Sequence, residues 1–110
     1  MAISRESGET VKRTLDMLGG SPAKAIYLVD SYGALYPDGV RALAETYLAA
    51  GQKYKKEIGI HAHNNQNLAF ANTLTCYAAG VNYLDAPVSG KARGAGNCAL
   101  ELLLGYLKGR

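Results

Sequence analysis

Two histidines separated by one residue, His61 and His63, are the residues whose types and spacing most directly suggest chemistry. They stand at the end of the segment 58–63, which has the apolar composition of a short buried strand. Alternate residues of a strand point to the same face, so both imidazoles can reach one divalent metal ion. A pair of hydrogen-bonded histidines lining a strand end is the alternative. The metal hypothesis is favoured because the chain has 2 histidines in all and asparagines follow them directly.

Two other segments place polar groups at the ends of predicted strands. Asp30 and Ser31 follow the apolar segment 25–29 and bring a carboxylate and a hydroxyl to the same sheet edge as the histidines, although both are ordinary turn residues. The glycine-rich segment 90–97 precedes a predicted helix, where backbone N–H groups can hold an anion. It has neither a Walker A nor a complete Rossmann glycine pattern, so a tight turn is favoured and a nucleotide-binding domain is the least favoured hypothesis.

Apolar periodicity predicts the elements that position these residues. An N-terminal helix is followed by three strand–helix units, over 1–20, 25–51, 57–80 and 81–108. Gly51 is expected to end the helix of the first unit. Asn64 or Asn65, with Asn65 favoured, is expected to cap the helix of the second. The fold class is therefore α/β, with residues 1–110 in one domain.

The spacing of the predicted strands sets a limit on the architecture. They begin near residues 25, 57 and 81, which is close to the ~31 residues per unit of an eight-unit (β/α)8 barrel of ~250 residues. A complete barrel cannot fit in 110 residues. The alternatives are a small open three-stranded sheet and a piece of a larger barrel.

Charge and cysteine content exclude several classes of protein. The net charge of +3 is too mild to indicate a nucleic-acid or membrane partner. The basic residues Lys53, Lys55 and Lys56 are interpreted as a solvated surface loop. Cys76 and Cys98 are too few for a zinc or disulfide framework and are expected to be buried thiols. No apolar run approaches the ~18 residues of a membrane span, so a cytoplasmic protein is expected.

Three segments together resemble one known family. They are Gly-Ile-His-Ala-His-Asn-Asn over 59–65, Asn-Leu-Ala over 67–69 and Arg-Gly-Ala-Gly-Asn over 93–97. These segments are similar to the later strands of the HMG-CoA lyase-like metal-dependent TIM barrels, and the resemblance covers about residues 25–108. It implies a fragment of a TIM (β/α)8 barrel that corresponds to about strands 5 to 7.

The resemblance also implies a metal site and a substrate site. His61 and His63 match two histidine ligands of the family, and Asn97 matches an asparagine that ligates or faces the metal in some members. Asp30 and Ser31 match residues placed around the substrate carboxylate. The implied cofactor is a divalent metal, Mn²⁺ first with Mg²⁺, Co²⁺ or Zn²⁺ as alternatives, which stabilises the enolate of a 2-oxo acid. No catalytic residue is assigned.

Within the family, the sequence is most similar to the 4-hydroxy-2-oxovalerate aldolases. The expected function is cleavage of a small 4-hydroxy-2-oxo acid to pyruvate and an aldehyde. Val88 stands where HMG-CoA lyases carry a catalytic cysteine, and Lys91 and Ala92 stand where Gly-Met or Gly-Leu is usual. An acyltransferase similar to isopropylmalate or homocitrate synthase, and a non-catalytic fragment that self-associates, are the alternatives.

The family's first strand carries an Asp metal ligand and an Arg that polarises the substrate, and neither has a counterpart in this sequence. The chain alone is therefore expected to be inactive. The expected partners are a small 2-oxo acid and either further copies of the chain or the rest of the barrel. If the chain is part of an aldolase, an acylating aldehyde dehydrogenase is a further expected partner.

Overall fold

The computed structural model describes residues 3–109, which form an α/β fold around one parallel sheet. The strands β1 (Ala25–Asp30), β2 (Glu57–Ala62) and β3 (Tyr83–Leu84) lie side by side in that order. Both pairs are parallel, with Asp30 opposite Ala62 and Leu84 opposite Ile60. The predicted third strand is therefore present but short, although Asp85 continues its ladder by donating its N–H to the Ile60 carbonyl at 3.0 Å.

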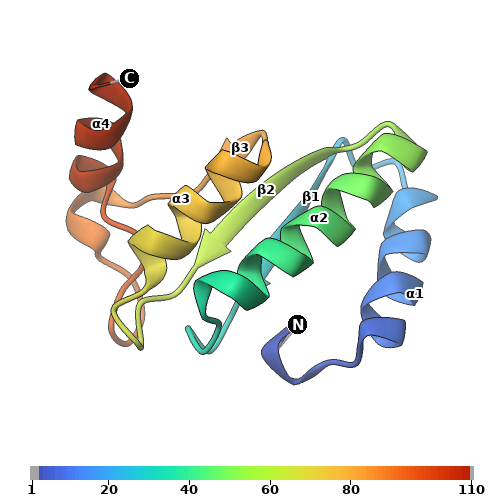
Figure 1. Ribbon diagram of the computed structural model, residues 1–110, viewed down its shortest axis with the longest axis horizontal. Coiled ribbons are helices and arrows are strands. Elements are labelled where there is room, and N and C mark those ends of the chain that lie inside the picture. The colour runs from blue at the N-terminus through green and yellow to red at the C-terminus, as the bar shows by residue number, and fades with distance from the viewer. Residues whose placement is uncertain (1–2, 110) are drawn as a thin grey trace.

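Four α-helices accompany the strands (Figure 1). They are α1 (Gly8–Gly19), α2 (Pro37–Tyr54), α3 (Ala69–Ala79) and α4 (Leu100–Lys108). Short 3-10 turns, η1 (Ile3–Arg5) and η2 (Val88–Gly90), precede α1 and α4. The first two positions of the helix predicted over 1–20 lie outside the described residues. Over residues 3–109, no helix combines the length and the apolar character that crossing a membrane requires.

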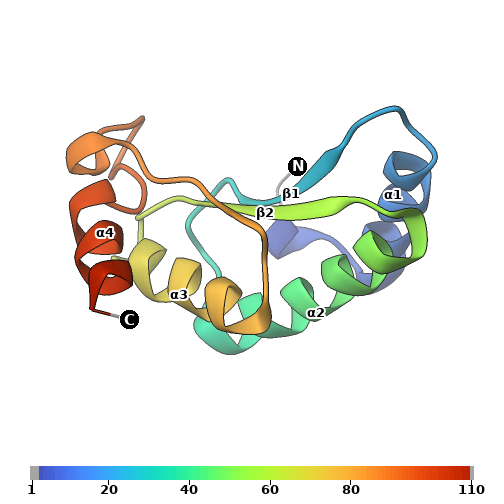
Figure 2. The same cartoon turned by 90° about the horizontal axis from the view of Figure 1, so that it is seen from above.

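The helices α2 and α3 lie along one face of the strands, and no α-helix of residues 3–109 covers the opposite face (Figure 2). Side chains along each strand point alternately to the two faces of the sheet, and apolar residues are concentrated on the face that the helices cover. Side chains such as Leu28, Ile58 and Ile60 are almost completely buried beneath the helices, and each contributes about 1.5–3 kcal/mol by leaving water. On the other face, Tyr27 and Tyr83 remain about 40% exposed (37% and 42%).

The uncovered face is closely packed around Gly59. The rings of Tyr27 and Tyr83 stack with centroids 6.3 Å apart. A Cβ atom at Gly59 would lie only 2.4 Å from the Tyr27 ring, so glycine is required for this contact. Residues 61 and 63 continue the same face of β2 toward its carboxyl end.

Two predicted helix signals are wrong in detail. Gly51 lies inside α2 rather than at its end, because the helix continues to Tyr54 and Lys55 takes the left-handed conformation with φ 53°. A Cβ atom at Gly51 would lie 2.8 Å from the Lys56 carbonyl oxygen, so this glycine permits close packing instead. The N-cap residue of α3 is Leu68, which makes no side-chain cap, and it is Asn64 rather than the favoured Asn65 whose Oδ1 accepts the N–H of Ala69, the first helical residue, at 3.1 Å.

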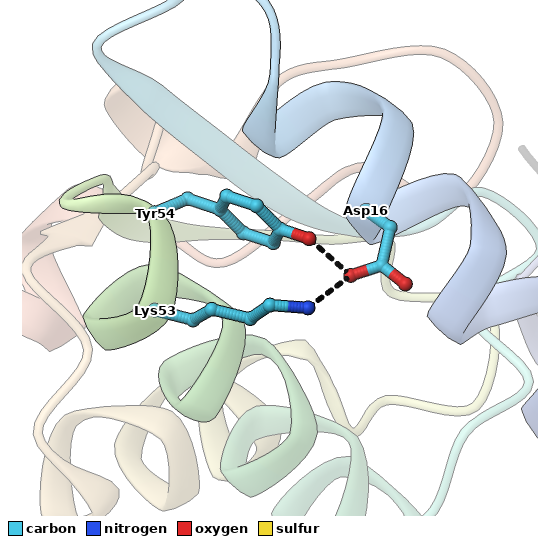
Figure 3. A network of polar contacts seen from close by, with 3 residues as sticks. All are labelled: Asp16, Lys53 and Tyr54. Carbon is cyan, nitrogen blue, oxygen red and sulfur yellow. Dashed lines mark hydrogen bonds and ion pairs between the residues drawn. The ribbon is translucent and has the colours of Figure 1, made fainter.

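Lys53 and Lys55 are solvent-exposed, as predicted, but Lys53 lies in the last turn of α2 rather than in a loop, and two of the three lysines make contacts with distant residues. Lys53 Nζ lies 3.1 Å from a carboxylate oxygen of Asp16, which also accepts the Tyr54 hydroxyl hydrogen at 2.5 Å (Figure 3). Lys56 Nζ donates to the carbonyls of Ser21 and Ala23, each at 2.7 Å. These contacts fix the connection that leads from α1 into β1.

Candidate metal centre

The two predicted metal ligands and Asn97 come together at the carboxyl end of β2. His63 pairs with Asn97 in an isolated antiparallel bridge just beyond Ala62. The rings of His61 and His63 are half-buried on the uncovered face, with centroids 5.2 Å apart and an edge-on orientation. The structure therefore places both imidazoles and the Asn97 side chain within one small region.

Both ring nitrogens of His61 have partners. The Nδ1 atom lies 3.0 Å from Asp85 Oδ2, and the Nε2 atom lies 3.1 Å from the Asn97 Nδ2. Asp85 was not among the residues singled out from the sequence. The available signal is its place near the end of segment 81–86, which is predicted as the third strand and ends at the same sheet edge as the histidines.

Asn97 is held rigidly by the loop before it. Its N–H donates to the Gly90 carbonyl at 3.0 Å, and the neighbouring Gly96 carbonyl accepts the Asn64 N–H at 2.8 Å. The residue is 7% exposed, and its Oδ1 is buried with no hydrogen-bond partner among residues 3–109. A buried amide oxygen without a partner is costly, which makes it suited to an additional ligand.

The donor set fits a divalent metal in part. Two imidazole nitrogens and an amide oxygen suit Mn²⁺, Zn²⁺ or Co²⁺. Within residues 3–109, no three His, Cys, Asp or Glu side chains are placed so that they could hold a metal ion together, so Asn97 is needed to complete three donors. A pocket of about 430 Å³ opens beside them, lined in part by His61, Asp85, Lys91 and Asn97.

Asp30 and Ser31 are placed differently from the histidines. Asp30 is completely buried, and its two carboxylate oxygens accept the N–H groups of Ala34 and Leu35 at 3.2 and 3.0 Å. Because Asp30 is paired with Ala62, its side chain shares the helix-covered face, opposite His61. Ser31 is exposed in the turn after β1. The structure thus does not bring the Asp30 carboxylate to the histidine cluster.

The glycine-rich segment is a tight turn whose backbone groups are largely used internally. Lys91 N–H donates to the Val88 carbonyl at 3.2 Å, and Gly96 N–H donates to Arg93 at 3.2 Å. The Ser89 N–H lies 2.9 Å from both carboxylate oxygens of Glu101. Hydrogen bonds from backbone N–H groups, first that of Glu101 itself and then that of Ser89, lower the pKa of this carboxyl. The turn therefore positions Lys91 and Asn97 around the pocket.

The two cysteines are free and buried, as predicted. Burial raises the pKa of Cys76 to about 12 and also raises the pKa of Cys98, which follows Asn97 directly. Both thiols are therefore protonated at neutral pH, and neither has the character of an activated nucleophile.

Comparison with known proteins places this chain in a family. Residues 1–110 match the HMGL-like family. A 4-hydroxy-2-oxovalerate aldolase of Thermus thermophilus is 41% identical over 91 residues, which are 83% of this chain and 26% of that protein. An oxaloacetate decarboxylase of Mycobacterium tuberculosis is 38% identical over 87 residues, 79% of this chain and 25% of that protein. The chain thus spans about a quarter of the length of these curated relatives.

Solved structures show the same relationship. The N-terminal domain of a putative aldolase from Bacteroides vulgatus superposes with a TM-score of 0.75 and 32% identity, covering 97% of this chain and 34% of that one. An HMG-CoA lyase from Bacillus subtilis gives a TM-score of 0.81 at 24% identity, covering 99% and 38%. The predicted fold, a parallel α/β fragment of a TIM barrel, is confirmed. Since the family match extends over the whole sequence, the chain belongs to the HMGL-like family.

Proposed function

We propose that this chain carries the histidine half of the metal site of a carbon–carbon lyase that cleaves a 4-hydroxy-2-oxo acid to pyruvate and an aldehyde. The observation that carries the proposal is the proximity of His61, His63 and Asn97, whose Oδ1 is unpartnered among residues 3–109. Two of these residues, His61 and Asn97, line one pocket. The 41% identity to an aldolase over 83% of this chain supports the choice of substrate class.

Each residue of the site has a separate role in this proposal. His61, His63 and Asn97 hold a divalent metal, with Mn²⁺ as the first choice. When bound, the metal supplies Lewis-acid stabilisation of the negative charge that develops on the substrate. Lys91, which lines the same pocket, brings a positive charge toward an anionic substrate. Ser31 stays a predicted substrate contact, whereas the completely buried Asp30 carboxylate supports the turn that presents Ser31 and does not itself contact substrate.

The donor set within this chain is neutral, which predicts weak metal binding because no carboxylate ligand offsets the charge of the cation. We therefore propose that full activity requires association with the rest of a barrel or with further copies of the chain. The expected acylating aldehyde dehydrogenase partner and the cytoplasmic location stay predictions.

A chimaeric enzyme tests the proposal directly. The 91 aligned residues of the Thermus thermophilus aldolase are replaced by the matching residues of this chain, and pyruvate release from 4-hydroxy-2-oxovalerate is measured with Mn²⁺. We expect activity above background, and we expect it to be lost in the same chimaera with His61→Ala. The Asp38→Asn chimaera, altered at an exposed carboxylate of α2, is the matched control.

Two results would count against the proposal. Equal activity of the chimaera and of its His61→Ala variant would refute the proposal that His61 binds the catalytic metal. A folded chimaera that binds Mn²⁺ and decarboxylates oxaloacetate, but releases no pyruvate from 4-hydroxy-2-oxovalerate, would favour the decarboxylase class instead. That second candidate is supported by the 38% identity to an oxaloacetate decarboxylase.

A further inference from the structure

Asp85 is the one acidic side chain that the structure brings to the histidine cluster within the described part of the chain, in hydrogen-bond contact with a ring nitrogen. Its carboxylate lies on the uncovered face of the sheet, since β3 pairs in register with β2 and Asp85 follows at the level of His61. It is 45% exposed and His61 is 33% exposed, so the contact is neither deeply buried nor fully solvated.

We propose that Asp85 is a positioning residue that holds His61 in its Nδ1–H tautomer, so that the Nε2 lone pair faces the site shared with Asn97. This inference rests on the proposed metal function, because a lone pair on Nε2 is what a metal requires of that imidazole.

The hydrogen bonds on the two sides of the ring agree with one tautomer. A carboxylate is only an acceptor, so the Nδ1 atom that lies 3.0 Å from Asp85 carries the hydrogen. The Asn97 Nδ2 is only a donor, so the Nε2 atom that lies 3.1 Å from it carries the lone pair. In the opposite tautomer of the neutral ring, the Nδ1 lone pair would face a lone pair of the Asp85 carboxylate, and the Nε2–H would face an N–H of the Asn97 amide. Neither contact would then be a hydrogen bond.

The unpartnered oxygen of Asn97 has a place in the same arrangement. With its Nδ2 on His61, the amide leaves Oδ1 buried and without a partner. A cation bound at Nε2 would displace the Nδ2 donor, and rotation of the amide would then turn the oxygen toward the ion. In this arrangement Asp85 holds His61 in the tautomer that can bind a metal ion. The Asn97 amide N–H donates to the Nε2 lone pair as long as no ion is bound there.

Other groups near Asp85 do not offer it a competing role. The phenol of Tyr27 on the same face has a raised pKa, first because of desolvation and then because of the negative charge of Asp85. The 3.0 Å contact with the imidazole is the single hydrogen bond that the structure gives the Asp85 side chain among residues 3–109.

The test compares the 110-residue chain with its Asp85→Asn variant, which keeps the shape of the side chain but can donate as well as accept. Asp38→Asn removes the same charge from the exposed first turn of α2 and is the matched control. Long-range ¹⁵N–¹H correlation spectra of the imidazoles, in metal-free buffer at pH 8.5, report the tautomer. The His63→Gln variant assigns the signals, and Mn²⁺ affinity is measured by isothermal titration calorimetry.

We expect His61 to be the Nδ1–H tautomer in the parent chain and in Asp38→Asn, and a mixture in Asp85→Asn. We expect Asp85→Asn to weaken Mn²⁺ binding by about 10- to 100-fold. A mixed tautomer in the parent chain, or an unchanged tautomer in Asp85→Asn, would overturn the inference. Lost Mn²⁺ affinity with an unchanged tautomer would likewise overturn it, because Asp85 would then act directly on the ion.

The two proposals can fail separately. If neither the parent chain nor Asp85→Asn binds Mn²⁺, but His61 changes to a mixture of tautomers in Asp85→Asn, the positioning role of Asp85 is supported and the metal function is refuted. If the parent chain and Asp85→Asn bind Mn²⁺ equally well and His61 has the same tautomer in both, the metal function is supported and the positioning role of Asp85 is refuted. Circular dichroism confirms that both variants retain the fold.

Discussion

Gly96 lies where the glycine-rich turn returns toward the histidines, and its replacement by alanine tests whether this turn positions Asn97. The residue has φ 86°, in the left-handed region, and an added Cβ would lie 2.3 Å from the Gly90 carbonyl oxygen. That oxygen accepts the Asn97 N–H at 3.0 Å. Alanine therefore brings backbone strain and forces the turn apart at the bond that holds Asn97.

Gly80 provides a matched control for the strain alone. It caps α3 with φ 99°, but an added Cβ meets nothing within 4 Å. The left-handed conformation costs a non-glycine residue about 1–2 kcal/mol, so Gly80→Ala should lose about that much stability. Gly96→Ala should lose a further ~1 kcal/mol, because the displaced carbonyl gives up a backbone hydrogen bond worth about 0.5–1.5 kcal/mol.

Thermal unfolding followed by circular dichroism measures both variants. The further ~1 kcal/mol corresponds to a Tm about 4–8 °C lower for Gly96→Ala than for Gly80→Ala. Mn²⁺ titration should show weaker binding in Gly96→Ala and unchanged binding in Gly80→Ala. Equal Tm values for the two variants would refute the steric argument, and parent-like Mn²⁺ affinity in Gly96→Ala would refute the link between this turn and Asn97.

Three other perturbations have expected outcomes. Hydrogen bonds from Tyr54 and Lys53 hold the pKa of Asp16 below its ordinary value, so their stabilisation is present above the unfolded-state pKa and is lost as pH falls through the folded-state pKa. Asp16→Asn should lower the Tm at pH 7 and change it little at pH 2. Asn64→Ala should reduce the free energy of unfolding in urea by about 1 kcal/mol through loss of the hydrogen bond from the Ala69 N–H, and Asn64→Asp should retain that bond. Cys76, with its pKa raised to about 12 by burial, should not react with Ellman's reagent at pH 8 until the protein is unfolded; fast reaction of the native thiol would contradict its burial.

The order of the elements follows from apolar periodicity, but their ends depend on contacts between distant residues. Gly51 has the residue type of a helix end, yet Ile58 and the Lys56 carbonyl approach it so closely that it serves packing, and Lys55 takes the left-handed conformation instead. Adjacent asparagines have equal capping chemistry. The structure separates them because Asn65 donates to the Tyr32 carbonyl at 2.6 Å in the neighbouring loop, which leaves Asn64 to accept the N–H of Ala69 at the start of α3.

In the candidate site, too, some residues can be predicted from their type and spacing, whereas the place of others depends on the register of the strands. His61, His63 and Asn97 could be found from spacing and resemblance, since residue type and position along the chain carry that information. Asp30 and Asp85 are both carboxylates at the end of an apolar run, and nothing local distinguishes them.

Strand register does distinguish them. Asp30 is paired with Ala62 and shares its helix-covered face, where the N–H groups of the following turn take both carboxylate oxygens. Leu84 is paired with Ile60, so Asp85 comes level with His61 on the uncovered face, where it contacts Nδ1. A shift of one residue in the pairing of β3 would turn Asp85 to the helix side and leave His61 without its acceptor. The acidic group of the histidine cluster is therefore set by the pairing of a two-residue strand, which is why the sequence pattern alone did not identify it.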